Sequence, residues 1–245
     1  MKHIVLAVIL ALPAGSMAQT YQSRIYEAFL QGRMDRWKTT MDQMERGVES
    51  GNDLSLMYEL TEAQYGYIAW CLTMKRKKEA EAILEKAERQ VEILLSRQGD
   101  NPRVYSLQGA FFGFRVQLQP IRAPFYGKKS EEANQKALET GPEEPQAWME
   151  RGNIAYYKPA MFGGSKSEAV PYYEKAVRLF ESTPGRTTQN WIYLNCLAGL
   201  AQAYEETGEE GKAGPVYRKL LRMEPDFKWV RDELYPRYLQ NHSGQ

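Results

Sequence analysis

The sequence predicts an all-α fold in which successive helical hairpins stack into a solenoid. Apolar residues recur at steps of three and four along most of the 245 residues, which is the period of amphipathic helices. Glycine and proline lie between these segments and separate the helices. An alanine followed by proline two residues later and by tyrosine four residues later occurs twice, at 169–173 and 213–217. The chain therefore contains an internal repeat, and repeated hairpins bury their apolar faces by stacking.

The N-terminal 18 residues have the features of a secretory signal peptide. Lys2 supplies the positive start, residues 4–12 form a short apolar run, and residues 16–18 are a small-x-small cleavage site. We therefore expect cleavage after Ala18 and a mature protein that is exported, either periplasmic or secreted. A buried N-terminal helix is the alternative interpretation. The apolar run is too short to span a bilayer, and no later stretch is suited to do so.

The rest of the chain divides into two capping segments and a repeat array. Residues 19–52 are expected to form one amphipathic capping helix that shields the first repeat. Residues 53–225 form the array of about four helical hairpins. Residues 226–245 are expected to form a C-terminal capping helix, broken near Pro236, and a polar tail.

Each hairpin is expected to consist of a first helix, helix A, and a second helix, helix B. Two connections within hairpins, residues 119–127 and 158–166, are expected to be enlarged loops because they are rich in proline and glycine. The third and fourth helices B are expected to begin just before Pro171 and Pro215, since proline is tolerated near a helix start. The expected helices A are 53–73, 103–118, 146–157 and the first half of 197–225, and the first three helices B are 79–97, 129–139 and 167–180.

The last repeat carries the most regular pattern. It contains, in order, a large-small pair, an aromatic residue, a turn glycine, a small residue, an aromatic residue four positions later and a closing proline. These residues are Leu200, Ala201, Tyr204, Gly208, Ala213, Tyr217 and Pro225. This order resembles the tetratricopeptide repeat (TPR), and the resemblance extends over roughly residues 53–225, with repeats longer than the family's usual length of about 34 residues. It implies a right-handed solenoid that binds proteins or peptides on a concave face lined by helices A.

The resemblance also places particular residues on that concave face. They are Tyr65, Ala69, Leu72, Phe114, Met149, Asn153, Tyr156, Tyr157, Asn195, Gln202 and Glu206. Tyrosine offers contact area and amides pair with a backbone, so the face suits a peptide or a partner helix. The alternative is that several of these tyrosines belong to the core. Asn153 matches the asparagine of the carboxylate clamp of some TPR proteins, but Met149 stands where that clamp has a lysine.

The two expected loops offer a second candidate site, for a small ligand. A Gly-Gly-Ser loop before a helix can present backbone N–H groups to an anion. The alternative is a structural hinge, with Ser165 and Glu168 forming a capping box at the start of helix B. The loop also resembles the exported TPR-like T-component of substrate-binding transport systems, which implies a ligand-binding accessory subunit. The residues of this candidate site are Arg122, Phe125, Tyr126, Phe162, Gly163 and Gly164.

A run of four basic residues, 75–78, lies between the first helices A and B. One interpretation is a surface that binds an acidic partner. The other, which we favour from the sequence, is a solvated turn between two helices.

Composition narrows the possible functions. Cleavage removes Lys2 from the 32 basic residues and leaves 31 of them against 31 acidic residues. That balance argues against nucleic acid or an anionic membrane surface as the main partner. The two histidines lie in the leader and in the tail, which removes most routes to a metal site or acid–base catalysis. We expect no enzyme, no cofactor and no metal site, but a scaffold that binds a protein or peptide of the cell envelope.

Overall fold

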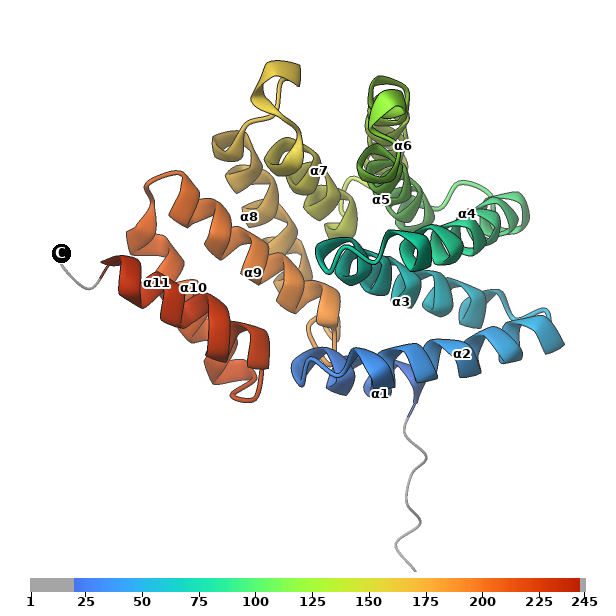
Figure 1. Cartoon of the computed structure of the whole chain (residues 1–245), viewed down its shortest axis with the longest axis horizontal. Helices are drawn as coiled ribbons and strands as arrows, with labels where there is room; N and C mark the ends of the chain where they lie inside the picture. Colours follow the sequence, from blue (N-terminus) through green and yellow to red (C-terminus); the bar gives the residue numbers. More distant parts are fainter. Residues whose placement is uncertain (1–19, 243–245) are drawn as a thin grey trace, which may run out of the picture.

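The computed structural model describes residues 20–242, which fold into eleven α-helices without a β-strand (Figure 1). The predicted all-α class is confirmed. The predicted leader lies outside the described residues. Within them, no helix is long and apolar enough to cross a membrane. The helices are α1 (Tyr21–Leu30), α2 (Met34–Ser50), α3 (Leu54–Thr73), α4 (Lys77–Gln98), α5 (Pro102–Leu118), α6 (Ala123–Thr140), α7 (Pro145–Tyr157), α8 (Lys166–Ser182), α9 (Trp191–Glu206), α10 (Glu210–Met223) and α11 (Tyr235–His242).

Eight of these helices form four hairpins, in which α3, α5, α7 and α9 are the helices A and α4, α6, α8 and α10 the helices B. Successive helices A contact one another, α3 with α5, α5 with α7 and α7 with α9, and each helix B contacts the following helix A. The helices A therefore lie on the inner side of an arc, which Figure 1 shows as a fan. The predicted solenoid of helical hairpins is confirmed.

Capping side chains and turn glycines set the helix boundaries. Asp53, Asn101 and Asn190 each precede a helix A and accept hydrogen bonds from backbone N–H groups of its first turn, at 2.9–3.1 Å. Gly99 and Gly208 follow α4 and α9 with φ angles of 72° and 77°, a conformation that favours glycine. These helix boundaries are therefore set by residues within or next to each turn.

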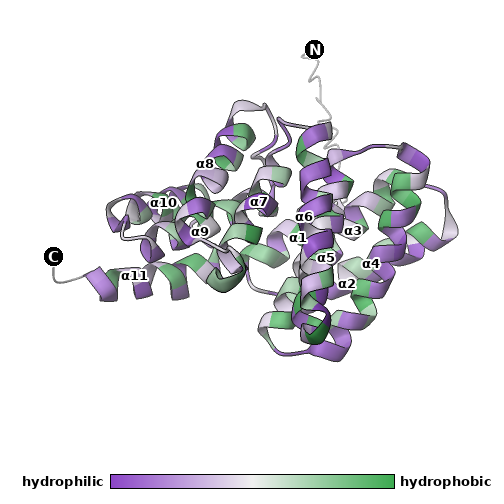
Figure 2. Cartoon of the chain, turned by 90° about the horizontal axis from the view of Figure 1, so that it is seen from above, coloured by the Kyte–Doolittle hydropathy of each residue, from purple (hydrophilic) through white to green (hydrophobic). Residues whose placement is uncertain are grey.

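Small residues let the two helices of a hairpin approach closely. The ring of Tyr173 on α8 lies against Gly152 of α7, where an added Cβ atom would come within 2.8 Å of the ring. In the last hairpin Ala201, Ala213 and Tyr217 are fully buried. The alanine–tyrosine spacing of the repeat therefore reflects dense packing between helices A and B. Figure 2 shows hydrophobic residues where helices face one another and hydrophilic residues on their outward sides.

The connections inside the hairpins differ in part from expectation. Residues 119–127 are not an enlarged loop, because a 3₁₀ turn leads directly into α6, which accommodates Pro124 in its first turn. The loop at 158–166 is present and contains a second 3₁₀ turn, Ala160–Phe162. Helices α8 and α10 each begin five residues before Pro171 and Pro215 rather than directly before them, and this shared offset agrees with an internal repeat.

Both terminal segments also depart from the predicted single helices. Residues 19–52 contain two helices, because Gly32, with a φ angle of 64°, ends α1 before α2 begins. At the other end of the chain, a π-helical turn, Val230–Leu234, leads into α11. Residues 228–242 are continuously helical, and Pro236, which closely follows the π-helical turn, does not break this stretch.

An aromatic cluster joins the N-terminal hairpin to the last repeat. The rings of Trp37 on α2 and Trp191 on α9 lie 5.1 Å apart, and both rest on Gly66 of α3. Phe29 of α1 lies 5.7 Å from Trp191 and 4.9 Å from Phe227. The indole N–H of Trp37 donates a hydrogen bond of 3.0 Å to a backbone carbonyl of α3. The N-terminal helices therefore cover the first repeat and also close the arc against the last one.

We expect Gly66→Ala to lower the free energy of unfolding by about 1–3 kcal/mol, because overpacking a filled core costs that much. A Cβ atom at Gly66 would lie 2.7 Å from Trp191 and 2.8 Å from Trp37. Gly127→Ala is the matched control, since that helical glycine has no atom within 4 Å of an added Cβ. It should raise stability by about 0.5–1 kcal/mol. Urea unfolding measures the free energy of unfolding of both variants. Equal changes in the two would contradict the close contact of Trp37 and Trp191 with Gly66.

Candidate functional site

The residues predicted for the concave face lie on the four helices A, and their burial divides them into two groups. The first group is buried or half-buried and comprises Tyr65, Ala69, Leu72, Phe114 and Met149. The second group lies on α7 and α9, is half-exposed or exposed, and comprises Asn153, Tyr156, Tyr157, Asn195, Gln202 and Glu206. Only Tyr65 and Met149 of the whole set are buried, and the two exposed members, Tyr157 and Glu206, both belong to the second group.

The first group is packed because the arc closes on itself. The ring of Tyr65 stacks on Phe114 at 5.7 Å between centroids and lies 6.0 Å from Trp191 of the last hairpin. Tyr65 is 5% exposed and Met149 is 1% exposed. The expectation that these two side chains contact a partner is therefore wrong in this closed arrangement, and the alternative that some of the tyrosines belong to the core holds for Tyr65.

A buried polar group lies beside the accessible part of the surface. Glu150 of α7 is 4% exposed, and one of its carboxylate oxygens accepts a hydrogen bond of 3.1 Å from the amide of Asn153. The hydroxyl of Tyr173 donates a hydrogen bond of 2.7 Å to the amide oxygen of Asn153. The other oxygen of Glu150 has no hydrogen-bond partner among the described residues. This second oxygen is itself buried, so the fold encloses it.

Burial changes the proton affinity of Glu150. Loss of solvation raises the pKa of its carboxyl to about 7, while the nearby Asn153 amide and Tyr65 hydroxyl act in the opposite direction. Sequence reasoning missed this residue because glutamates on helices are usually solvated. Its position three residues before Asn153, on the same side of a helix, is the signal that could have identified it.

A second polar contact crosses from α7 to α9. The hydroxyl of Tyr156 donates a hydrogen bond of 2.5 Å to Glu206, and Lys166 forms an ion pair with the same carboxylate. The ring of Tyr157 lies edge-on against Tyr156 at 4.8 Å and is 69% exposed. Tyr156 and Glu206, both predicted for this face, are thus brought together, and Tyr157 projects beside them.

The residues of the second candidate site fall into two separate clusters. The guanidinium of Arg122 lies over the rings of Phe125 and Tyr126, at 5.3 and 5.0 Å from their centroids. Phe162, from the next hairpin, is 58% exposed in the loop between α7 and α8. Arg122, Phe125 and Tyr126 therefore contact one another, whereas Phe162 lies in the loop of the next hairpin.

The two glycines of that loop have a structural role. Gly163 has a φ angle of 87°, and a Cβ atom on Gly164 would overlap the backbone carbonyl of Lys158. The hydroxyl of Ser165 then accepts a hydrogen bond of 3.2 Å from the N–H of Glu168 and caps α8. These contacts agree with the hinge and capping interpretation of the Gly-Gly-Ser sequence.

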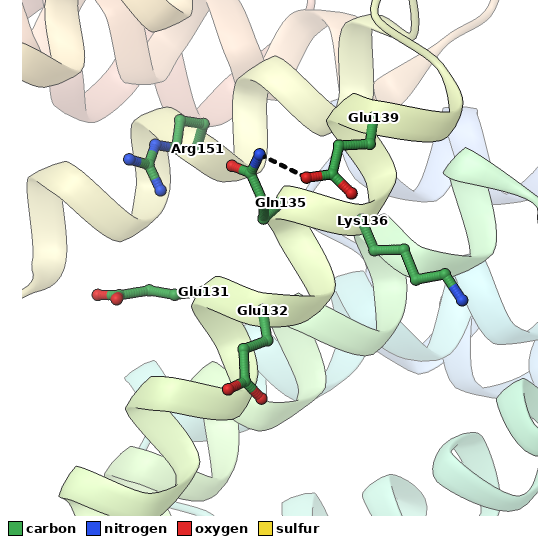
Figure 3. A pocket seen from close by; sticks show the side chains of 6 residues that line it. All are labelled: Glu131, Glu132, Gln135, Lys136, Glu139 and Arg151. Atoms are coloured by element: carbon green, nitrogen blue, oxygen red, sulfur yellow. Dashed lines mark hydrogen bonds between the residues drawn. The ribbon is translucent and has the colours of Figure 1, made fainter.

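A depression lies between α6 and α7, close to these loops. It has a volume of about 450 Å³ and is lined by Glu131, Glu132, Gln135, Lys136, Glu139 and Arg151 (Figure 3). A smaller one of about 150 Å³ adjoins it and reaches Gly163. Their lining is mostly charged, which differs from the apolar lining usual for ligand pockets. Residues 20–242 contain no group of three or more side chains suited to hold a metal ion.

Comparison with known proteins agrees with the repeat pattern. The sequence matches the tetratricopeptide repeat family over residues 194–227, the segment that covers most of the last hairpin. That segment is a tetratricopeptide repeat, and the stacked hairpins around it have a TPR-like fold. No curated protein matches it.

Two solved structures share this fold. The HusA haemophore from Porphyromonas gingivalis is 21% identical, with a TM-score of 0.61 over 78% of this chain and 96% of that one. The thermophilic TPR protein TTC0263 from Thermus thermophilus is 18% identical, with a TM-score of 0.57 over 90% of this chain and 98% of that one. At these identities the likeness concerns the fold.

We expect Glu150 to make the stability of this protein depend on pH. The folded carboxyl has a pKa raised to about 7, against an ordinary value of 4.5, so the folded state holds the proton more tightly. Its contribution is therefore complete below about pH 4.5 and is lost as the pH rises through 7, a loss of up to about 3 kcal/mol. Glu150→Gln, which resembles the protonated form, should abolish this loss.

Urea unfolding of wild type and Glu150→Gln at pH 5 and pH 8 measures the effect. The variant should be close to wild type at pH 5 and more stable than wild type at pH 8. Equal stability differences at the two pH values would show that Glu150 does not titrate between them.

Proposed function

We propose that this protein is a non-enzymatic scaffold that binds another protein or peptide of the cell envelope through the inner surface of α7 and α9. A TPR-like fold in itself indicates a protein-interaction scaffold. The observation that supports this particular surface is the exposure of Tyr157 beside half-exposed amide and tyrosine side chains on two neighbouring helices A. Such a surface combines aromatic contact area with groups that pair with a polypeptide backbone.

The charge of this surface bears on what it binds. A carboxylate clamp needs cations, but the residue one turn before Asn153 is Met149 and its neighbour is the acidic Glu150. The oxygen of Glu150 without a partner is buried and out of a partner's reach, whereas the exposed carboxylate of Glu206 favours hydrogen-bond donors and cationic side chains in the partner. We therefore expect an internal segment or a basic side chain to bind here rather than a C-terminal carboxylate.

The remaining parts of the proposal rest on the sequence. Export is supported by the leader at residues 1–18, with cleavage after Ala18. A non-enzymatic role is supported by the scarcity of histidine, the commonest acid–base catalyst. His242 is the one histidine among the described residues, and its ring nitrogen lies 2.7 Å from a backbone carbonyl one turn earlier in α11.

A small-ligand accessory of a transport system is the alternative proposal. It would use the cluster of Arg122, Phe125 and Tyr126, together with the loop residues Phe162, Gly163 and Gly164. The cation held over two aromatic rings supports it, because an organic acid could pair with Arg122 and stack beside Phe125. A thermal-shift screen of organic acids, with haem included because a haemophore shares the fold, measures such binding; a flat profile would contradict it.

Site-specific photo-crosslinking tests the scaffold function. Replacing Tyr157 by the photoreactive residue benzoylphenylalanine should link the protein to one defined envelope polypeptide, because this side chain projects into the proposed surface. The same residue at Ile93, which is 41% exposed on helix B of the first hairpin, is the control and should not link to that polypeptide.

Substitution of the same position provides the quantitative measurement. We expect Tyr157→Ala to weaken binding of the crosslinked polypeptide by about 1–3 kcal/mol, with little change in folding because the side chain is exposed. Binding is measured by calorimetry, with Ile93→Ala as the matched variant. Equal affinities of Tyr157→Ala and Ile93→Ala would place the partner on a different surface.

A further inference from the structure

The turns that join helix A to helix B have a common position. Every hairpin runs along helix A and returns along helix B, so all of these turns lie at one edge of the solenoid. They are the α3–α4 turn at residues 74–76, the α5–α6 turn at 119–122, the α7–α8 loop at 158–165 and the α9–α10 turn at 207–209. The first three of them carry exposed apolar and basic residues. Figure 1 shows the α5–α6 turn and the α7–α8 loop at the upper edge of the arc. An ion pair of 2.5 Å between Lys158 and Glu131 joins the α7–α8 loop to α6.

Large apolar side chains project from this edge into solvent. Ile121 is 99% exposed and Met161 is 83% exposed, and both lie at the tips of 3₁₀ turns. Phe162, Met74 and Phe125 are also exposed. The turns at the opposite edge, α4–α5, α6–α7 and α8–α9, carry no exposed large hydrophobic side chain. Exposed apolar residues gathered on one side of a protein mark a contact surface.

Basic residues accompany the apolar tips. The α3–α4 turn has four of them at 75–78, residues 119–129 include Arg122, Lys128 and Lys129, and residues 158–166 include two lysines. The acidic residues that pair with some of them lie farther along the helices. Lys75, Lys77 and Lys78 form no ion pair with a described carboxylate, and neither do Arg122 and Lys129, which lie over aromatic rings. The edge is therefore basic at its first three turns although the chain as a whole is nearly neutral, whereas the α9–α10 turn is flanked by Glu205, Glu206, Glu209 and Glu210.

We propose that this basic, apolar edge docks on the surface of an anionic lipid bilayer. Apolar side chains that project from convex turns do not enclose a ligand, but they can enter the boundary between lipid headgroups and acyl chains. The neighbouring lysines and arginines then lie level with lipid phosphates, which attract them. The proposal uses residues on the turns rather than those on the inner face of α7 and α9, so the scaffold could hold a polypeptide while it lies on a membrane.

Vesicle co-sedimentation tests this inference. The purified protein, beginning after the predicted cleavage site in every variant, is mixed with phosphatidylcholine vesicles with and without roughly one third phosphatidylglycerol. Wild type should bind the anionic vesicles more tightly. Ile121→Ser combined with Phe125→Ser should weaken that binding roughly tenfold or more, because two apolar side chains no longer enter the interface.

The basic residues and the control position give separate readouts. Lys75→Gln, Lys77→Gln and Lys78→Gln together should weaken binding to anionic vesicles about tenfold while binding to neutral vesicles stays the same. Ile93→Ser, an exposed apolar position away from these turns, should leave both unchanged. Failure of wild type to bind anionic vesicles would overturn the proposal. Equal binding of wild type and the Ile121→Ser/Phe125→Ser variant to anionic vesicles would also overturn it. The proposal would likewise fail if this double variant lost binding to an organic acid or an acidic polypeptide but kept its binding to vesicles.

Discussion

The contact of two tryptophans with one glycine determines how this array of hairpins is arranged. Gly66 leaves room on α3 for Trp37 from the N-terminal hairpin and Trp191 from the last one. A row of hairpins stabilised by neighbours alone would stay open, because each repeat contacts only the next. Here a long-range aromatic contact ties the first helices to the last hairpin. The N-terminal segment is therefore part of the core, and the shape of the inner surface depends on it.

Closure decides which surfaces remain for a partner. Tyr65 packs against both Phe114 and Trp191, so part of the inner faces of α3 and α5 is covered by the protein itself. The inner faces of α7 and α9 stay accessible, and there the fold retains a buried carboxylate at Glu150 with one unpaired oxygen. A buried group of this kind costs stability. The turns between helices A and B take no part in closure, which leaves their apolar tips exposed at the edge.

The sequence was most informative where structure depends on near neighbours. The all-α class, the hairpins and the tight packing of the last unit follow from residues within about one repeat of each other, and these could be predicted. The meeting of Trp37 with Trp191 could not, because 154 positions separate them and no spacing rule connects them. The helix end at Gly32 and the helix start at Pro124 were not predicted, for a different reason. A single residue of either type can end a helix or begin one, and its neighbours in space decide which.

The two candidate surfaces, the inner face and the edge formed by the turns, also depend partly on nearby residues and partly on distant ones. The prediction that Tyr157 and Asn153 lie on the inner face came from the resemblance to the TPR pattern. Whether that face was open depended on a distant segment. The basic edge could be predicted in part, because its basic runs are visible in the sequence but their common position depends on the fold. Net charge averages over the chain and hides the basic runs, but the hairpin period returns every turn between helices A and B to one side. Surface charge in a repeat protein is therefore better assigned turn by turn than from composition.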